Sequence, residues 1–315
     1  MAEIVTVKRQ SSVLHHPTLP CLSQDYTINL TAGCQNLCRY CYAQSFRHHP
    51  GQGKLVFYAN TLERLKQELP RKRKKPGRVY FSTGCEPFQP YERILDDLYD
   101  IMDLLLNSGV ALLISTKSVV PERFISLFTR HPGMVQVQVG LTTVDDAVRR
   151  LMEPEAAPVE KRLENLSRLQ SSGVAAECRM DPLIPGLTDG EDSFVALCAA
   201  VSETRTATAS ASYMFLRQDD FSALDVTHKG WSFREMKTRL YTHKIEPYCG
   251  SRAVRVADPG YRAQKYELLR QIADEHEISL RLCGCKNPDL ASTCCHPAPP
   301  SAVKNSQGSL FDPPK

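Results

Sequence analysis

The chain has 315 residues, of which 42% are hydrophobic and 23% charged, with a formal net charge of +4 and a pI of about 8.4. These proportions are ordinary for a globular protein, and the length suits one large barrel-type domain or a domain with an appendage. No run of 18 or more apolar residues and no secretory signal peptide occur, so we expect a cytoplasmic protein without membrane-spanning helices. A basic excess this small neither requires nor excludes a nucleic-acid partner.

Short runs rich in β-branched and aromatic residues alternate with stretches that have helical periodicity. Leu95, Leu98, Met102 and Leu105 recur at intervals of three and four residues, as one buried helix face requires. The alternation predicts parallel βα units, and six of them fit a partial (β/α)6 TIM-like barrel of the α/β class better than a closed barrel. The expected strands are residues 25–31, 78–83, 111–116, 135–143, 175–183 and 207–216, with a short final strand at 279–282, and the expected helices are 61–69, 92–108, 121–130, 159–171, 190–202 and 260–277.

The composition along the chain suggests four parts. We expect an N-terminal extension at residues 1–24, the partial barrel at 25–225, a cysteine-rich C-terminal extension at 226–297 and a disordered tail at 298–315. The tail prediction depends on its high content of proline and serine.

Seven of the twelve cysteines fall into two groups. In a reducing compartment, clustered cysteines more often indicate metal binding or catalysis than disulfides. The first group is Cys34, Cys38 and Cys41, and the second is Cys283, Cys285, Cys294 and Cys295. Two separate groups predict two metal sites.

The first group follows directly on the first expected strand, in the segment GCQNLCRYCY at residues 33–42. Three thiolates at spacings of four and three residues can converge on one iron–sulfur cube from a single loop. Because a [4Fe–4S] cube has four irons, three cysteines leave one iron open for a chelating cofactor. Tyr40 and Tyr42 flank the last cysteine, where they could pack on an adenine ring. The alternative is a zinc loop whose fourth ligand lies elsewhere.

This cysteine pattern resembles that of the radical S-adenosylmethionine (radical SAM) superfamily, and the wider context is similar to its spore photoproduct lyase-like branch. The similarity covers about residues 20–220. The triplet is highly specific, whereas the other motifs are specific only in combination and order. They are residues 25–30 (DYTINL), 41–43 (CYA), 81–90 (FSTGCEPFQP), 115–118 (STKS) and 181–186 (DPLIPG).

The resemblance implies an enzyme that cleaves S-adenosylmethionine reductively to a 5′-deoxyadenosyl radical, with an electron donor such as flavodoxin or ferredoxin. It also implies that residues at the carboxyl ends of the strands bind the cofactor. The polar turn after the second strand would hold the methionine amino group, and a lysine after the third strand its carboxylate. The candidate residues are Ser82, Thr83 and Glu86 for the amino group, Lys117 for the carboxylate, Thr142 for the ribose and Arg179 in the barrel mouth. A turn with a surface carboxylate is the alternative for Glu86.

Cys85 has two interpretations. It is a candidate catalytic thiol that exchanges a hydrogen atom with the radical, or a small buried apolar residue. Spore photoproduct lyases carry a hydrogen-donor cysteine at this strand end, but alignment on the acidic residue places it nearer Thr83. This departure leaves the reaction of the present chain open.

The second cysteine group lies in the segment at residues 282–296 (LCGCKNPDLASTCCH). Its four thiols and His296 could ligate an auxiliary iron–sulfur cluster or a zinc ion, with Cys249 as an outside ligand. Free thiols near a flexible terminus are the alternative. Spore photoproduct lyases proper lack a matching group, which suggests different chemistry or an extra electron relay.

Five consecutive cations, Arg71 to Lys75, precede the second expected strand. Such a run could neutralise phosphates, but it is as often a solvated loop, and its position predicts that it lies opposite the barrel mouth. Together with the family resemblance, this basic run leads us to expect that the substrate is a base in a nucleic acid, which the enzyme would repair or modify. The alternatives are a peptide or small-metabolite substrate, or a non-enzymatic metal-binding interaction module.

Overall fold

The structure is a computed structural model, and it describes residues 2–17, 22, 25–81, 83–216, 224–245 and 254–290. At its centre lies a seven-stranded sheet in which all neighbouring strands are parallel. The strand order is β15-β9-β8-β7-β6-β5-β2, so each strand lies beside the next strand of this sheet along the chain. The bounds are β2 Tyr26–Ile28, β5 Arg78–Phe81, β6 Ala111–Thr116, β7 Val135–Gly140, β8 Ala175–Leu183, β9 Thr208–Tyr213 and β15 Ser279–Leu282.

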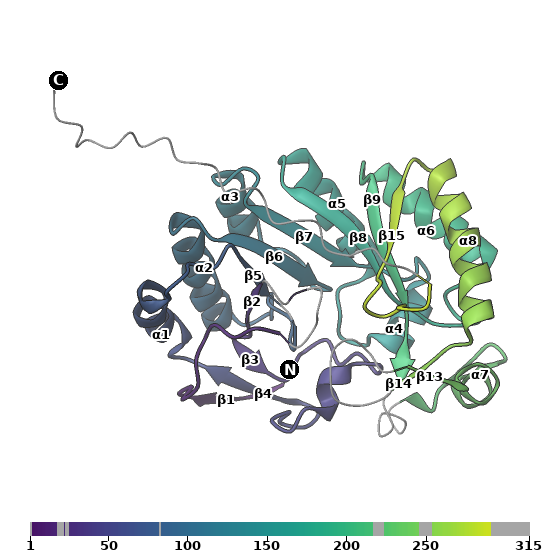
Figure 1. Cartoon of the computed structure of the whole chain (residues 1–315), viewed down its shortest axis with the longest axis horizontal. Helices are drawn as coiled ribbons and strands as arrows, with labels where there is room; N and C mark the ends of the chain where they lie inside the picture. The colour runs from purple at the N-terminus through teal and green to yellow at the C-terminus, as the bar shows by residue number, and fades with distance from the viewer. Residues whose placement is uncertain are drawn as a thin grey trace.

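Helices connect these strands and cover one face of the sheet. Figure 1 shows α2, α3, α5, α6 and α8 along the same side of it. The strand residues that face the helices are apolar; Val79 and Ile114 lie in the same buried core as Leu98 of α2. This packing removes the apolar faces of both layers from water, which is the main stabilising contribution in such folds. The helices are α1 Thr61–Glu68, α2 Glu92–Asn107, α3 Glu122–Thr129, α4 Asp146–Met152, α5 Val159–Ser171, α6 Glu191–Glu203, α7 Phe233–Leu240 and α8 Pro259–Glu275, with 3-10 turns η2 Tyr42–Ser45 and η3 Leu69–Arg71.

The opposite, inner face of the sheet is polar. Tyr80 of β5 shares a hydrogen bond of 2.8 Å with Ser115 of β6, and Ser115 donates to Gln138 of β7 at 2.7 Å. Gln138 in turn donates to Glu177 of β8, whose carboxylate also pairs with Arg281 of β15. Because buried polar groups need hydrogen-bond partners, this chain of contacts fixes the inner faces of neighbouring strands relative to one another.

Smaller sheets flank the carboxyl ends of the main strands. A three-stranded sheet of order β1-β4-β3 joins the N-terminal segment to the region after the first cysteine group. A second one, of order β10-β14-β13, follows β9, and β11 pairs with β12 in a short hairpin. Their bounds are β1 Glu3–Val7, β3 Thr31–Ala32, β4 Lys54–Tyr58, β10 Phe215–Leu216, β11 Thr227–His228, β12 Trp231–Ser232, β13 His243–Ile245 and β14 Val254–Val256.

The expected α/β fold with a partial TIM-like barrel is confirmed, with a seventh parallel strand in the main sheet. The expected short strand at 279–282 is β15, and it pairs with β9 because the apolar face of α8 packs on the core and returns the chain in parallel direction. The expected strand at 207–216 is split, since β10 leaves the main sheet and pairs with β14. Within the described residues, no helix is both long and apolar enough to cross a membrane.

Candidate functional site

The first cysteine group lies on a loop that begins at a glycine which no other residue can replace without strain. Gly33 follows β3 and has φ of +84°, a conformation that residues with a Cβ rarely adopt. A Cβ at this position would lie 2.5 Å from the carbonyl oxygen of Lys54 and 2.9 Å from Cγ of Pro50. The glycine therefore lets the loop turn tightly against β4 and fixes where Cys34 emerges.

The three thiols of this loop line one cavity. Its walls are formed by Cys34, Leu37, Cys38, Cys41, Gln44, His49, Gly51 and Gln52. Burial raises the pKa of Cys34 and of Cys38 above the ordinary value, so without a bound cation both thiols stay protonated. A metal reverses this preference, because a coordinating thiol is deprotonated outright.

The number and type of these donors suit an iron–sulfur cluster. Among the described residues, no three His, Cys, Asp or Glu side chains are grouped so that they could hold one metal ion. A tetrahedral zinc ion with bonds of about 2.3 Å would draw its thiolates to within about 4 Å of one another. In an iron–sulfur cube each cysteine binds a different iron, so the thiols stay further apart. Three thiols around one cavity are therefore a donor set suited to a [4Fe–4S] cluster.

The end of α4 holds the cysteine loop against the barrel. The backbone N–H of Arg39 donates to the carbonyl of Met152 at 2.9 Å, and its Nε donates to the carbonyl of Leu151 at 2.7 Å. Next along the loop, the Tyr40 hydroxyl donates to the buried carboxylate of Glu153. The helix starts where the Asp145 side chain accepts hydrogen bonds from two backbone N–H groups, a strong N-cap that the sequence analysis did not use.

Glu153 is a buried charged residue with charged partners. Its Oε2 lies 2.5 Å from Nη2 of Arg162, and its Oε1 lies 4.0 Å from Nζ of Lys117. Burial alone would raise the pKa of Glu153, but Arg162 and Lys117 outweigh it and lower the pKa below the ordinary value. The carboxylate is thus ionised beside the loop of the three cysteines.

The turn after β5 is fixed by Asn29, a residue that sequence reasoning did not single out. The Asn29 side chain donates to Oγ1 of Thr83 at 3.0 Å and accepts from the backbone N–H of Gly84 at 3.0 Å. Thr83 also shares a 2.7 Å hydrogen bond with Thr27, and its carbonyl accepts from the Tyr42 hydroxyl. Ser82, the first residue of this turn, lies outside the described residues.

Cys85 belongs to the same turn but does not line the cavity of the three cysteines. Its half-buried thiol lies 3.6 Å from Oδ1 of Asn29. Burial raises the pKa of Cys85, so at neutral pH the sulfur keeps its hydrogen. A neutral thiol is what a hydrogen-atom donor requires, but the same state fits a small buried residue.

Glu86 is held by four donors from its own chain. Its two oxygens accept from the Thr116 hydroxyl at 2.6 Å, the Lys117 N–H at 2.9 Å, the Phe88 N–H at 3.1 Å and the Asn36 amide at 3.1 Å. A carboxylate has about four lone-pair sites, so these bonds use its whole capacity. Glu86 therefore connects the cysteine loop to the ends of β5 and β6. This geometry favours a structural role for Glu86 over its expected role as the acceptor for an ammonium group.

Lys117 reaches into the barrel mouth from the end of β6. Its ammonium group lies 3.4 Å from the carbonyl of Asp181 and 5.8 Å from the centre of the Tyr40 ring. Its side chain crosses β7 at Gly140, where a Cβ would lie 2.9 Å from Cγ of Lys117. Glycine at this point of β7 therefore leaves room for the lysine to bend toward the cysteine loop.

A second group of charges lies at the end of β8. Arg179 donates to the carboxylate of Asp181 at 2.6 Å, and Lys286 donates to both of its oxygens at 2.6 and 2.8 Å. Burial would raise the pKa of Asp181, but Lys286 and Arg179 lower it well below the ordinary value. Thr142 lies buried at the end of the neighbouring strand β7. Lys286, which sequence reasoning missed, thus joins the turn after β15 to the barrel mouth.

Part of the second cysteine group lies at this same turn. Cys283 is buried and its N–H donates to the carbonyl of Ala211 at 3.2 Å, while Cys285 is half-buried. Cys294, Cys295, His296 and Cys249 lie outside the described residues. The structure therefore brings two of the expected ligands to the carboxyl end of β15 and leaves the metal site itself a prediction.

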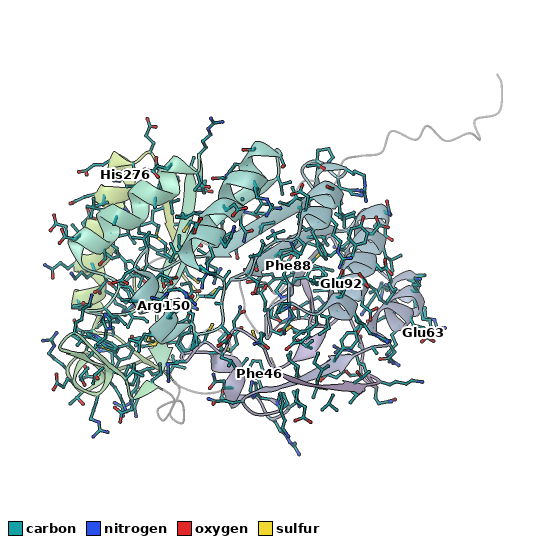
Figure 2. The ribbon with its side chains drawn as sticks, turned by 180° about the vertical axis from the view of Figure 1, so that it is seen from behind. Phe46, Glu63, Phe88, Glu92, Arg150 and His276 are labelled. Atoms are coloured by element: carbon teal, nitrogen blue, oxygen red, sulfur yellow. The ribbon has the colours of Figure 1, made fainter. Side chains whose placement is uncertain are left out.

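The basic run lies at the amino end of β5, opposite the barrel mouth, as expected. Lys75 donates to the carbonyl of Ser108 at 2.7 Å, and Lys72 pairs with Glu68 at 3.1 Å. Arg71, Arg73 and Lys74 are exposed. Figure 2 shows the two ends of the barrel: His276, which precedes β15, is at the top, and Phe46, which follows the cysteine loop, is at the bottom.

Of three residues that the sequence analysis missed, two have a weak signal in the sequence. Asn29 lies near the end of the first expected strand, and Lys286 lies four residues after the last one, so both are near strand ends where ligands are expected. Glu153 gave no such signal, because only the fold brings the end of α4 to the cysteine loop.

Comparison with known proteins agrees with this geometry. The sequence model of the Radical SAM superfamily matches residues 28–198, which is more than half of the chain. An uncharacterized protein of Methanocaldococcus jannaschii is 29% identical over 192 residues, covering 60% of this chain and 71% of that protein. A protein of Pseudomonas phage M6 called radical SAM Nα-GlyT isomerase is 23% identical over 270 residues, covering 84% of this chain but only 54% of that protein.

The fold is also similar to that of a solved structure. A spore photoproduct lyase mutant with bound AdoMet and dinucleoside spore photoproduct superposes with a TM-score of 0.65, covering 89% of this chain and 81% of that chain. At 13% sequence identity, this likeness concerns the fold alone.

Proposed function

The chain belongs to the radical SAM superfamily, and we propose that it is an enzyme that holds a [4Fe–4S] cluster with Cys34, Cys38 and Cys41 and binds S-adenosylmethionine beside it. When bound, these groups supply a 5′-deoxyadenosyl radical. The observation that supports the proposal most is that three thiols of one loop line a single cavity. Three protein ligands leave one iron of a four-iron cluster open to the cofactor.

The residues around this cavity can bind the cofactor by charge and hydrogen bonding. We propose that Lys117 binds the methionine carboxylate, because its ammonium group projects over Tyr40 toward the cysteine loop. Thr83 and Ser82 would bind the amino group, Thr142 the ribose, and Arg179 an anionic group in the mouth. Glu86 would position these cofactor-binding residues without touching the cofactor, since its four hydrogen bonds hold the ends of β5 and β6 together.

For the substrate we propose a base in DNA or RNA. The fold is similar to that of a lyase solved with a dinucleoside photoproduct, and the mouth carries the cations Lys117, Arg179 and Lys286. The basic run does not support this proposal, because it lies at the opposite end of the barrel. A base would enter the mouth unpaired or flipped out, since it must reach the radical.

Two further expectations accompany this proposal. Reductive cleavage of the cofactor needs an electron, which we propose comes from a flavodoxin- or ferredoxin-type donor in the cytoplasm. We also propose that residues 25–225 form the catalytic barrel and 226–297 an extension that carries the second cysteine group.

The cluster is tested by anaerobic iron quantification together with a cofactor-cleavage assay. We expect the triple variant Cys34→Ala/Cys38→Ala/Cys41→Ala to lose cofactor cleavage and the iron of this site. Cys198→Ala is the matched control, since Cys198 is a free thiol buried in α6 within the hydrophobic core. A protein that is fully active with zinc and without iron would overturn the enzyme proposal and favour a metal-binding interaction module.

The substrate class is tested by anaerobic turnover with cofactor deuterated at the 5′ position. The enzyme is incubated with cellular fractions of DNA, RNA, peptides and small molecules, and each fraction is analysed for deuterium. We expect deuterium, or a cofactor-dependent change in mass, in a nucleic-acid fraction. Labelling of the peptide or small-molecule fraction alone would overturn the nucleic-acid proposal.

A further inference from the structure

Three aromatic rings form a continuous strip beside the cysteine loop. The Tyr42 ring lies 5.6 Å from the Phe46 ring in an edge-to-face arrangement and 6.4 Å from the Phe215 ring. Phe46 is 39% exposed, whereas Tyr42 and Phe215 are half-buried. The flat face of an aromatic ring at the surface can pack against a ring of a ligand.

The strip follows the rim of the barrel mouth. Tyr42 and Phe46 come directly after Cys41, and Phe46 packs over the turn after β5, where a Cβ on Gly84 would lie 3.5 Å from its ring. Phe215 lies on β10, just beyond the carboxyl end of β9. Figure 2 shows Phe46 at the end of the molecule to which the main strands run. The rings therefore lie at the end of the barrel that carries the cysteine loop.

A cation lies at the Phe215 end of this strip. Nζ of Lys286 lies 5.1 Å from the centre of the Phe215 ring, and the same ammonium group binds both oxygens of Asp181. Asp181 is also paired with Arg179. The ammonium group of Lys286 thus lies beside the aromatic rings. Aromatic rings next to a positive charge are the combination that binds single-stranded nucleic acid.

We propose that Tyr42, Phe46 and Phe215 form a stacking surface for an unpaired base and its neighbour in single-stranded DNA or RNA, with Lys286 binding the adjoining phosphate. This inference rests on the proposed function and names the residues that select its substrate. Stacking accepts any base, because every base has a π-face, and the cation adds attraction to the backbone. A peptide substrate would gain little from Lys286 unless it were acidic.

The test measures binding of labelled single-stranded DNA and RNA oligonucleotides of about 12 nucleotides to the anaerobically reconstituted full chain, at several salt concentrations. We expect Phe46→Ala and Phe215→Leu each to weaken binding about tenfold, as loss of one stacked base predicts. Phe46→Tyr, which keeps the ring, should bind within about threefold of the wild type. Iron content and thermal unfolding of each variant show that it is folded.

Lys286 is tested by the salt dependence rather than by affinity alone. We expect Lys286→Gln to reduce the slope of the logarithm of affinity against the logarithm of salt concentration by about 0.7, the value for one phosphate contact on a single strand. Lys286→Arg should keep the slope. Lys74→Gln removes the same charge from the exposed basic run at the opposite end and should leave the slope unchanged.

The outcomes separate this inference from the proposed function. If the wild type binds neither DNA nor RNA at low salt, both the nucleic-acid function and the stacking surface are wrong. If the wild type binds but the aromatic variants bind equally well, only the stacking surface is wrong. If Lys74→Gln lowers the slope and Lys286→Gln does not, nucleic acid binds at the basic run and the inference fails.

Discussion

The Tyr40 hydroxyl donates a hydrogen bond to Oε1 of Glu153, and this contact ties the cysteine loop to the end of α4. The other oxygen of Glu153 pairs with Arg162, which itself donates to the carbonyl of Gly140 at 2.9 Å. One carboxylate therefore connects the loop of the three thiols to α5 and β7. Because Glu153 and Arg162 are buried, the geometry of the loop depends on this charge.

Removing the negative charge of Glu153 should destabilise the protein strongly. In Glu153→Gln the amide can still accept from Tyr40, but Arg162 is left buried without a carboxylate. Breaking a buried pair from one side typically costs about 3–5 kcal/mol, which denaturant unfolding would measure. Glu164→Gln is the matched control, because Glu164 pairs with Lys161 on the exposed side of α5 and its loss should change stability little. Equal stability of the two variants would show that Glu153 does not hold the loop.

The tight turn at Gly33 gives a second prediction. Gly33→Ala should cost more than the 1–2 kcal/mol typical of a left-handed conformation, because the new Cβ also meets the Lys54 carbonyl, and it should lower the iron content. Gly53→Ala separates the two effects, since Gly53 has φ of +74° but nothing within 4 Å of a Cβ. We expect Gly53→Ala to lose only about 1–2 kcal/mol and to keep its iron. If both variants bind iron equally, the close approach at Gly33 is unimportant for the site.

Local sequence patterns predicted the sheet and the cysteine cavity but not the contacts between them. Alternating strands and helices, and the spacing of Cys34, Cys38 and Cys41, are properties of neighbouring residues, so they are visible in the sequence. The hydrogen bond from Thr116 to Glu86 and the pairing of Lys286 with Asp181 join residues 30 or more positions apart. The sequence shows that such residues are polar and lie at strand ends, but only the fold decides which of them are already paired.

Asp181 gives a prediction about pH. Its pKa is lowered in the folded protein, so its ionised form contributes stability above the unfolded pKa of about 4, and this contribution is lost as the pH falls below that value. Asp181→Asn should therefore be less stable than the wild type at pH 7, and the difference should shrink toward pH 3. Denaturant unfolding of iron-free protein at both pH values measures it, so that acid loss of the cluster does not interfere.

The control for this prediction is Asp192→Asn, which removes a carboxylate from the exposed side of α6. It should change the free energy of unfolding by less than about 0.5 kcal/mol at either pH. A stability difference for Asp181→Asn that is the same at pH 7 and pH 3 would mean that its charge does not stabilise the fold.

The second cysteine group gives a prediction about metal content. We propose that Cys283, Cys285 and at least one of Cys294 and Cys295 ligate an iron–sulfur cluster or a zinc ion. The triple variant of Cys34, Cys38 and Cys41 should then retain iron or zinc, and adding Cys283→Ala and Cys285→Ala should remove it. Elemental analysis of both proteins provides the measurement. A triple variant that contains neither metal would eliminate the second site.

The last prediction concerns Cys85, which we propose as the thiol that exchanges a hydrogen atom with the substrate. Its position at the carboxyl end of β5 and its raised pKa, a consequence of burial, keep an S–H group at the mouth of the barrel. In Cys85→Ala the amount of product formed per 5′-deoxyadenosine released should fall at least about tenfold, in the range that mutation of a catalytic group produces.

This ratio separates catalysis from structure, because a variant that merely binds cofactor or substrate less well loses both products together. Cys178→Ala is the matched control: its thiol is buried on β8 in the hydrophobic core, so the ratio should stay at the wild-type value. Cys85 lies beside Asn29 and outside the cavity of the three cysteines, so a purely structural cysteine predicts an unchanged ratio in Cys85→Ala as well. In that case the hydrogen must return to the substrate from 5′-deoxyadenosine or from another residue.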